Sequence, residues 1–366
     1  MMPESYSTSF KDKKLVRALI SKLAVFKNRP MRFMEVCGTH TMSIFRHGIR
    51  SILPSNIELI SGPGCPVCVT SAQDIDNMIA LASYPNVIIA TFGDLIRVPG
   101  TNGSLAEARA KGAKVEIVYS PTDALKIAYN NPSAEVVFLG IGFETTVPGV
   151  AASLLEAYEK QITNFSIYSV HKTMPKALDV LLSDPELKID GLICPGHVSA
   201  IIGAKSYESL AQTKQIPCVV AGFEPADIVQ AILMLAKQVD KGQHEVINCY
   251  PRAVSWEGNQ RALHIMYKAF KPCKTVWRGL GPIESSGLEI KDYLTMFDAS
   301  SRFSLKEAGY GSANPKGCLC GEVIKGKKKP VECSLFAKAC TPTKPIGPCM
   351  VSSEGSCAAY YKYGGV

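Results

Sequence analysis

Hydrophobic positions follow two patterns between residues 30 and 230: short runs rich in β-branched residues, and longer segments with apolar residues at helical spacing. The short runs predict strands at Arg32–Val36, Ile57–Ser61, Val87–Thr91, Val115–Tyr119, Glu135–Ile141, Phe165–Val170, Gly191–Cys194 and Pro217–Ala221. The longer segments predict helices at Ala72–Ala82, Leu105–Lys111, Ala151–Lys160, Lys176–Leu182 and Ala226–Gln238. Strands that alternate with helices are typical of βαβ units. The sequence therefore predicts an α/β protein with parallel sheets.

Two pairs of segments resemble each other along this region. VIIATFGDLIRVPG (Val87–Gly100) is similar to VVFLGIGFETTVPG (Val136–Gly149), and ELISGPGCPV (Glu58–Val67) is similar to GLICPGHVSA (Gly191–Ala200). Such internal similarity favours two similar α/β domains, which we place at residues 1–130 and 131–250.

The alternation fades beyond residue 250, where Gly, Pro, Lys and Cys become frequent. Helical patterns remain at Asn259–Phe270 and Gly287–Phe297. The end of the chain has too few apolar residues for a core of its own, so a bound metal cluster is expected to order it. We therefore predict a small irregular and helical C-terminal domain at residues 251–366.

Composition and charge exclude several classes of protein. The chain has 366 residues, of which 46% are hydrophobic and 20% charged, as in soluble proteins of more than one domain. The formal net charge is +8, but Lys and Arg are spread without interleaved aromatic residues, so nucleic-acid binding is not predicted. No apolar run reaches the ~20 residues that span a bilayer, and the N-terminal region is too basic for a signal peptide. We expect a cytoplasmic protein without membrane contact.

Thirteen cysteines are the unusual feature of the composition. Six of them lie in the tail of the chain: Cys318, Cys320, Cys333, Cys340, Cys349 and Cys357. Because a reducing compartment disfavours structural disulfides, this group favours metal binding or redox chemistry. The long, unequal gaps suit one [4Fe–4S] cluster held by four thiolates better than a zinc site, whose cysteines usually come in tight pairs, or a disulfide framework. The spacing leaves open which four cysteines bind.

Two further thiol motifs each follow a predicted strand. GPGCPVC places Cys65 and Cys68 at the start of a helix, where the helix N-terminus favours thiolate redox chemistry or metal ligation. Half of a zinc site is the alternative reading of this pair. CGTHT places Cys37 and His40 at the end of an earlier strand. Because the carboxyl ends of parallel strands line the ligand crevice of an open sheet, we expect these four residues to converge.

Three other strand ends carry groups capable of acid–base chemistry. TFGD, GFETT and CPGH provide Asp94, Glu144 and His197. Each is predicted either to support the site or partner docking, or to cap a helix. The phosphate-loop, nucleophile-elbow, zinc-protease and radical-SAM motifs are missing from the sequence, which disfavours ordinary NTPases, hydrolases and zinc proteases.

These motifs resemble the HypD family of [NiFe]-hydrogenase maturation factors over essentially the whole chain. The resemblance is carried by CGTHT, GPGCPVC, TFGDLIRVPG, GFETTVPG and CPGH, and in the tail by GCLCGEV, ECSLFAKACTP and GPCMVSSEGSCAAYYKYG. It implies a monomer with two α/β domains and a C-terminal [4Fe–4S] domain. It also implies a scaffold that works with the chaperone HypC to assemble an Fe(CN)2CO unit, with cyanide supplied by HypE.

The resemblance further implies roles for the cysteines of the tail. The residues that match the cluster ligands are Cys318, Cys333, Cys340 and Cys357. Cys320 and Cys349 would then form a neighbouring redox-active pair, in the manner of ferredoxin–thioredoxin reductase.

The resemblance also implies roles at the two strand-end motifs. Cys65 and Cys68 match a central dithiol, and Cys37 matches the thiol that ligates the incoming iron together with HypC. We expect Cys65 and Cys68 to act as an electron relay or as auxiliary iron ligands, and His40 to orient or deprotonate Cys37. One departure is Ser71, where the family pattern has Pro; it affects the entry to a helix and none of the expected ligands.

A metallocentre-assembly scaffold with redox activity is therefore expected rather than an ordinary turnover enzyme. The alternative is a disulfide reductase of the ferredoxin–thioredoxin type that acts on a partner protein. A zinc-stabilised binding module is the third possibility.

Overall fold

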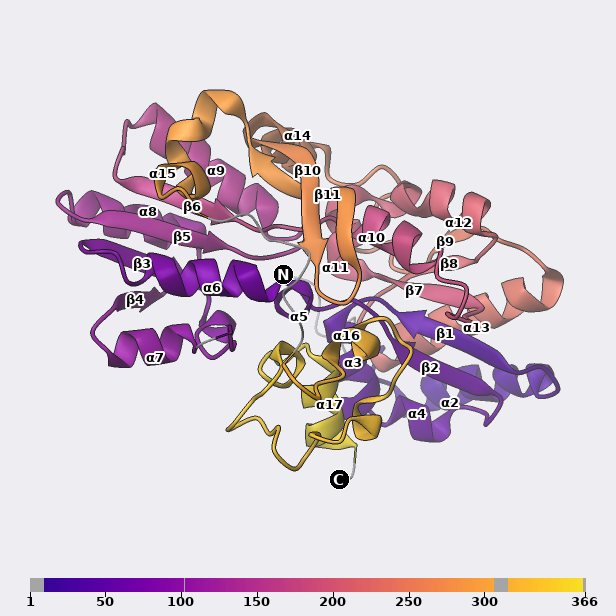
Figure 1. Ribbon diagram of the computed structural model, residues 1–366. Coiled ribbons are helices and arrows are strands. Elements are labelled where there is room, and N and C mark those ends of the chain that lie inside the picture. The colour runs from indigo at the N-terminus through magenta and orange to yellow at the C-terminus, as the bar shows by residue number, and fades with distance from the viewer. Residues whose placement is uncertain (1–9, 102, 306–314, 365–366) are drawn as a thin grey trace.

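Two parallel β-sheets, each covered by helices, form the body of the protein in the computed structural model (Figure 1). The structure describes residues 10–101, 103–305 and 315–364. The predicted fold class, α/β with two parallel-sheet units, is confirmed. No helix within these ranges is long and apolar enough to cross a membrane.

The larger sheet has the strand order β2-β1-β7-β8-β9, and all neighbouring strands are parallel. Its strands are β1 (Met31–Glu35), β2 (Ile57–Ser61), β7 (Gly191–Pro195), β8 (Cys218–Ala221) and β9 (Val246–Asn248). The helices of this unit are α2 (Lys13–Leu23), η1 (Ala24–Phe26), α3 (Gly38–Arg46), α4 (Ile49–Ile52), α11 (Gly196–Ile202), η3 (Ala204–Tyr207), α12 (Glu208–Lys214) and α13 (Pro225–Lys241). Met34 of β1 aligns with Ile60 of β2 and Leu192 of β7, so these three strands end at the same edge.

The smaller sheet has the order β4-β3-β5-β6 and is also parallel throughout. Its strands are β3 (Val87–Thr91), β4 (Lys114–Ile117), β5 (Glu135–Gly140) and β6 (Phe165–Ser169). The helices of this unit are α6 (Ala72–Leu81), η2 (Gly93–Leu95), α7 (Leu105–Ala110), α8 (Pro121–Asn130), α9 (Val147–Glu159) and α10 (Met174–Leu181). Every residue of β3 is buried, which is typical of a parallel strand covered on both faces.

The chain passes from the larger sheet to the smaller one and back, so the predicted boundary at residue 130 is wrong. Strands β1 and β2 share a sheet with β7, β8 and β9, while β3 to β6 form the other sheet. The two members of each similar pair lie in the same sheet. β3 lies beside β5 in the smaller sheet, and β2 and β7 lie on either side of β1 in the larger sheet. Helical crossovers allow parallel strands that are distant in sequence to become neighbours, which a sequential division cannot anticipate.

An antiparallel hairpin lies between the two sheets and points toward the tail (Figure 1). The elements of this region are α14 (Gln260–Ala269), β10 (Phe270–Trp277), β11 (Gly281–Ile290), η4 (Asp292–Phe297) and α15 (Ala299–Arg302). The single helix predicted at Gly287–Phe297 is therefore wrong, because its first residues pair with β10. The hairpin turns at Gly279 and Gly281, whose φ angles of +84° and +80° favour glycine.

The cysteine-rich tail packs against the larger-sheet unit. Its elements are α16 (Cys320–Ile324), η5 (Pro330–Glu332), η6 (Pro348–Met350) and α17 (Ser356–Tyr363). Helix α17 packs on α3, where the rings of Tyr360 and Phe45 lie 4.5 Å apart. One hydrophobic core extends from both sheets into the tail, so the tail is part of the folded body.

Candidate functional site

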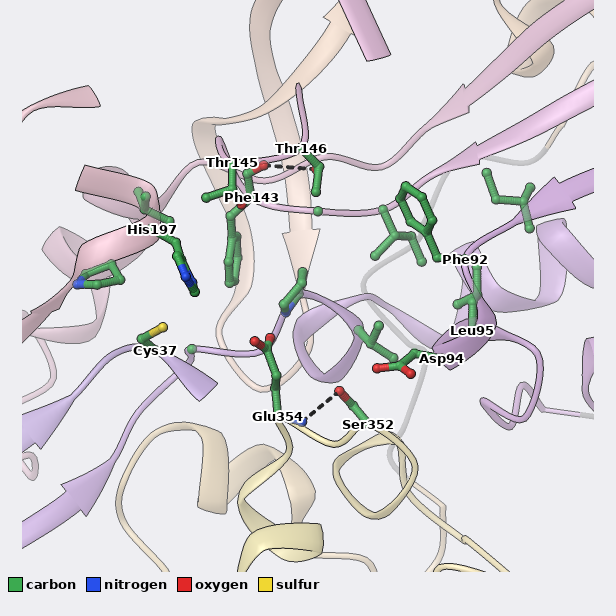
Figure 2. A pocket seen from close by; sticks show the side chains of 18 of the residues that line it. Cys37, Phe92, Asp94, Leu95, Phe143, Thr145, Thr146, His197, Ser352 and Glu354 are labelled. Atoms are coloured by element: carbon green, nitrogen blue, oxygen red, sulfur yellow. Dashed lines mark hydrogen bonds between the residues drawn. The ribbon is translucent and has the colours of Figure 1, made fainter. Parts of the chain in front are cut away.

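A cleft of about 340 Å³ lies where the carboxyl ends of the two sheets meet the tail (Figure 2). The side chains of Cys37, Asp94, His197 and Glu354 point into the same space. Cys37 follows β1, Asp94 follows β3, His197 follows β7, and Glu354 comes from the tail. The site therefore forms at the strand ends, where an open α/β sheet binds its ligands, but it uses both sheets at once.

Cys37 is the one cysteine that lines this cleft in the described part of the chain. It is the N-cap residue of α3, and the nearby backbone N–H groups of His40 and Thr39 partly offset the rise in its pKa. Burial, with a smaller effect from the charge of Glu354, raises the pKa of the Cys37 thiol to about 12. The thiol is thus protonated at neutral pH, and a metal must displace that proton in order to bind.

Glu354 is a cleft residue that the sequence analysis missed. The Thr39 hydroxyl donates a 2.7 Å hydrogen bond to its Oε1. Gly38 makes this approach possible, because a Cβ there would lie 2.4 Å from the Cβ of Glu354. Burial, followed by the charge of Asp94, raises the pKa of Glu354. No sequence motif identifies Glu354 as a site residue. The one feature that could have drawn attention to it is that it is the single acidic residue between Cys349 and Cys357.

The three acid–base residues predicted at strand ends have different positions. Asp94 lies in η2 and is exposed at the cleft, and His197 stacks on Phe223 with ring centroids 4.0 Å apart. Glu144 lies outside the cleft lining and accepts a 2.9 Å hydrogen bond from the backbone N–H of Met174, the first residue of α10. Burial raises the pKa of Glu144 to about 7. For Glu144, helix capping is therefore the role that its contacts support.

His40 is buried behind the cleft. Its Nε2 lies 2.9 Å from the carbonyl oxygen of Gly222, and burial lowers its pKa to about 4, so the neutral ring donates from Nε2. Nδ1 has no hydrogen-bond partner among the described residues. The imidazole thus anchors α3 to the loop after β8 and makes no hydrogen bond to Cys37.

Cys65 and Cys68 flank the first turn of α5 (Pro66–Val69) and form a disulfide. Both are buried and neither lines the cleft. The loop before them nevertheless touches CGTHT, because the backbone N–H of Gly38 donates a 2.9 Å hydrogen bond to the carbonyl of Gly64. The two motifs therefore meet through their backbones, and the disulfide lies where the chain leaves the larger sheet for the smaller one.

Ser71, where the resemblance led us to expect Pro, caps α6. Its Oγ accepts a 3.0 Å hydrogen bond from the backbone N–H of Asp74 and donates a 2.7 Å hydrogen bond to Oδ2 of the same residue. Proline has no such side-chain oxygen, so the serine gives this helix a different N-terminal cap.

Five of the six tail cysteines line a second, small cavity: Cys318, Cys320, Cys333, Cys340 and Cys357. Cys349 is buried beside it and interacts with Cys320 and Cys357. Among the described residues, no three His, Cys, Asp or Glu side chains are close enough to enclose a single metal ion. The thiols that surround this small apolar cavity are chemically suited to an iron–sulfur cluster, in which each iron takes its own thiolate.

The disulfide and the tail cysteines are close in space. Helix α5, which carries Cys68, packs against α16, which begins at Cys320, and against η6, which contains Cys349. All three cysteines belong to the same hydrophobic core. The disulfide and these two tail cysteines are therefore carried by elements that pack against each other.

The fold and the cleft define a two-sheet α/β protein that presents one thiol, two carboxylates and an imidazole above a cysteine-lined tail. A family model named HypD and described as "Hydrogenase formation hypA family" matches residues 13–364. Hydrogenase maturation factor HypD of Rhodobacter capsulatus is 43% identical over 370 residues, covering 98% of both chains. Hydrogenase maturation factor HypD2 of Bradyrhizobium diazoefficiens is 46% identical over 369 residues, covering 98% of this chain and 97% of that protein. Hydrogenase maturation factor HypD of Escherichia coli K12 is 45% identical over 351 residues, or 95% and 93% of the two chains.

The chain therefore belongs to the HypD family of hydrogenase maturation factors. The resemblance seen in the sequence motifs is confirmed by a match that covers nearly the whole chain.

Proposed function

We propose that the protein is the scaffold on which the Fe(CN)2CO unit of [NiFe]-hydrogenase is assembled, and that Cys37 holds the iron. The observation that carries this proposal is the single thiol in the cleft between the two sheets and the tail. A thiolate is a soft ligand, which suits iron that carries cyanide and carbon monoxide.

The lining of the cleft is suited to such a cargo. Apolar side chains, among them Phe92, Phe143 and Ile141, form much of its wall and provide a water-poor surface for small diatomic ligands. Asp94 and Glu354 supply negative charge that attracts an iron cation before its ligands are attached.

The coordination of the iron is expected to be shared with other molecules. Among the described residues, Cys37 is the one thiol in the lining of the cleft, so this chain offers few soft ligands there. We propose that a thiol of HypC and the cyanide and carbonyl ligands complete it, with HypE delivering the cyanide. Release of the finished unit then requires breaking only one bond to this chain.

The tail supplies the redox part of the proposal. Cys318, Cys333, Cys340 and Cys357 would hold a [4Fe–4S] cluster, which when bound provides single electrons. Cys320 and Cys349 would exchange with the Cys65–Cys68 disulfide: the former pair is oxidised to a disulfide as the latter is reduced to two thiols. The packing of α5 against α16 and η6 supports this exchange.

The alternative, a disulfide reductase acting on a partner, uses the same cysteines but has no use for the Cys37 cleft. The experiment that separates the two measures iron, zinc and sulfide in protein purified without oxygen, and then the infrared spectrum of its complex with HypC. About four irons and four sulfides per chain are expected for one cluster. Bands of iron-bound cyanide and carbonyl support the scaffold, whereas a cluster without these bands supports the reductase.

Cys37→Ala is the decisive variant. It should abolish the infrared bands while leaving the iron and sulfide of the tail unchanged. Cys273→Ala is the matched control, because Cys273 is a half-buried thiol of the hairpin that lies outside both cavities. Unchanged bands in the Cys37 variant would refute the proposed role of this residue.

A further inference from the structure

Arg278 lies at the tip of the hairpin and is almost fully buried, with 5% of its surface exposed. Its backbone N–H donates a 2.7 Å hydrogen bond to the carbonyl of Val69, and its Nε donates a 2.9 Å hydrogen bond to the carbonyl of Thr70. These two carbonyls follow directly on the Cys65–Cys68 turn. The guanidinium is therefore fixed against the end of α5.

The same tip also touches the tail. The adjacent residue, Gly279, packs so closely on α16 that a Cβ there would lie 2.8 Å from the carbonyl oxygen of Gly321. Gly321 directly follows Cys320, whose sulfur interacts with that of Cys318. The tip of the hairpin thus contacts both the segment that follows the disulfide and the helix that begins at Cys320.

The charge of Arg278 is not balanced by the residues described. Nη2 of Arg278 is buried and has no hydrogen-bond partner among the described residues. The guanidinium also forms no ion pair with any described carboxylate. A buried guanidinium always carries its proton, so its charge calls for a nearby anion.

We propose that Arg278 is a positioning residue that stabilises negative charge on the cysteine-lined tail site and thereby raises its reduction potential. The inference rests on the proposed function, because that site acquires its negative charge when four thiolates hold a cluster. An added electron increases the negative charge further, and an adjacent fixed cation favours that reduced state. Arg278, at the hairpin tip, would then set the reduction potential of the cluster that supplies electrons to the nearby Cys65–Cys68 disulfide.

The test compares full-length R278Q and R278K with the wild type, each reconstituted with iron and sulfide without oxygen. Redox titration followed by electron paramagnetic resonance gives the midpoint potential of the cluster. K271Q is the matched control, since it removes a charge from the exposed far end of the same hairpin, where Lys271 pairs with Asp292. Iron and sulfide content is measured for every variant.

R278Q should have a lower potential than the wild type. At the wild-type midpoint, its ratio of reduced to oxidised cluster should fall at least tenfold, which corresponds to about 59 mV for one electron. R278K, which keeps the charge, and K271Q should stay near the wild-type value. If R278Q does not fold, R278M takes its place, and loss of the cluster from both neutral variants but not from R278K would also support the role of the charge.

An unchanged potential in R278Q would overturn the inference, and so would equal shifts in R278Q and R278K, because packing would then be the cause. In both cases the cluster is present and the proposed function stands. A wild-type protein that binds no iron and sulfide would instead overturn the cluster proposal together with this inference.

Discussion

The hydroxyl of Thr39 donates a hydrogen bond to Oε1 of Glu354, and this bond joins residues that are 315 positions apart in the chain. Thr39 belongs to the first turn of α3, and Glu354 belongs to the loop before α17. The contact closes the tail over the cleft and holds a carboxylate near the Cys37 thiol. The cleft and the cysteine-rich tail are thereby coupled mechanically.

Thr39→Val should weaken iron retention at the cleft, because it removes this hydrogen bond at nearly constant side-chain volume. A hydrogen bond to a charged group contributes about 1.5–3 kcal/mol, so we expect roughly a tenfold or greater loss of infrared-detected Fe(CN)2CO in the HypC complex. Thr101→Val is the matched control, since it removes a 2.6 Å hydrogen bond from a threonine hydroxyl to Asp76 on the smaller-sheet unit. Equal retention in both variants would contradict a role for the contact.

Gly347→Ala should disrupt the cysteine-lined cavity. A Cβ at this position would lie 2.9 Å from Sγ of Cys318 and 3.0 Å from Sγ of Cys320, so one or both sulfurs must move. We expect the iron and sulfide content to fall by at least half. Gly149→Ala, in the first turn of α9, is the control: its Cβ meets nothing within 4 Å, and the replacement should raise stability by up to about 1 kcal/mol. A normal cluster content in the Gly347 variant would show that the cavity tolerates the extra carbon.

The strands were predictable because their apolar runs are local signals. Ile57–Ser61 and Val87–Thr91 have the predicted bounds in the structure, and the cleft lies at the strand ends where the motifs placed it. The pairing of the strands was not predictable, because the sequence of a crossover helix does not determine which sheet the next strand joins. β10 and β11 were missed because neither has an uninterrupted apolar run: Pro272 interrupts the first, and Pro282 and Gly287 interrupt the second.

The candidate site was predicted in part. Cys37, Asp94 and His197 line the cleft, as the motifs predicted. Glu354 could be assigned to the cleft only from the tertiary structure, because it reaches the cleft where the tail packs closely on Gly38. His40 is close to Cys37 in sequence, but its side chain does not face the thiol. Helix α3 directs the ring away from Cys37 and toward the carbonyl of Gly222.

The tail cysteines should separate into two groups by substitution. Cys333→Ser should abolish the cluster, because Cys333 lines the tail cavity and is one of the expected ligands. Cys349→Ser should retain the cluster, since Cys349 lies outside that lining, but should slow reduction of the Cys65–Cys68 disulfide at least tenfold. Visible absorption reports the cluster, and thiol alkylation with mass spectrometry after anaerobic reduction reports the disulfide. Loss of the cluster in the Cys349 variant would contradict the proposed division.

Acid should destabilise the fold through buried histidines. His171 is 1% exposed, its Nδ1 lies 3.0 Å from Oγ of Ser169, and burial lowers its pKa to about 3. Burial lowers the pKa of His40 to about 4. In the unfolded chain both residues titrate near pH 6.5, so between about pH 4 and pH 6.5 the unfolded state binds more protons than the folded state. The free energy of unfolding must therefore fall as the pH decreases through this window.

Glu144 has the opposite effect. Burial raises its pKa to about 7, so between about pH 4.5 and pH 7 the folded state keeps a proton that the unfolded state has lost. Its contribution to stability therefore grows as the pH falls from 7 to 4.5 and offsets one of the two histidines. From these three groups together we expect a loss of roughly 1.4 kcal/mol per pH unit as the pH falls from about 6.5 to about 4.5.

His171→Asn tests the contribution of a single histidine. Asparagine can replace the hydrogen bond to Ser169 but cannot take up a proton, so this variant should be less stable at pH 7 yet lose about 1.4 kcal/mol per pH unit less than the wild type between pH 4 and pH 6. Urea unfolding at a series of pH values measures both quantities, and His264→Asn on an exposed position of α14 serves as the control. If the pH dependence of the free energy of unfolding were the same in this variant and the wild type, His171 would already be protonated in the folded protein, which would contradict the effect of burial on its pKa.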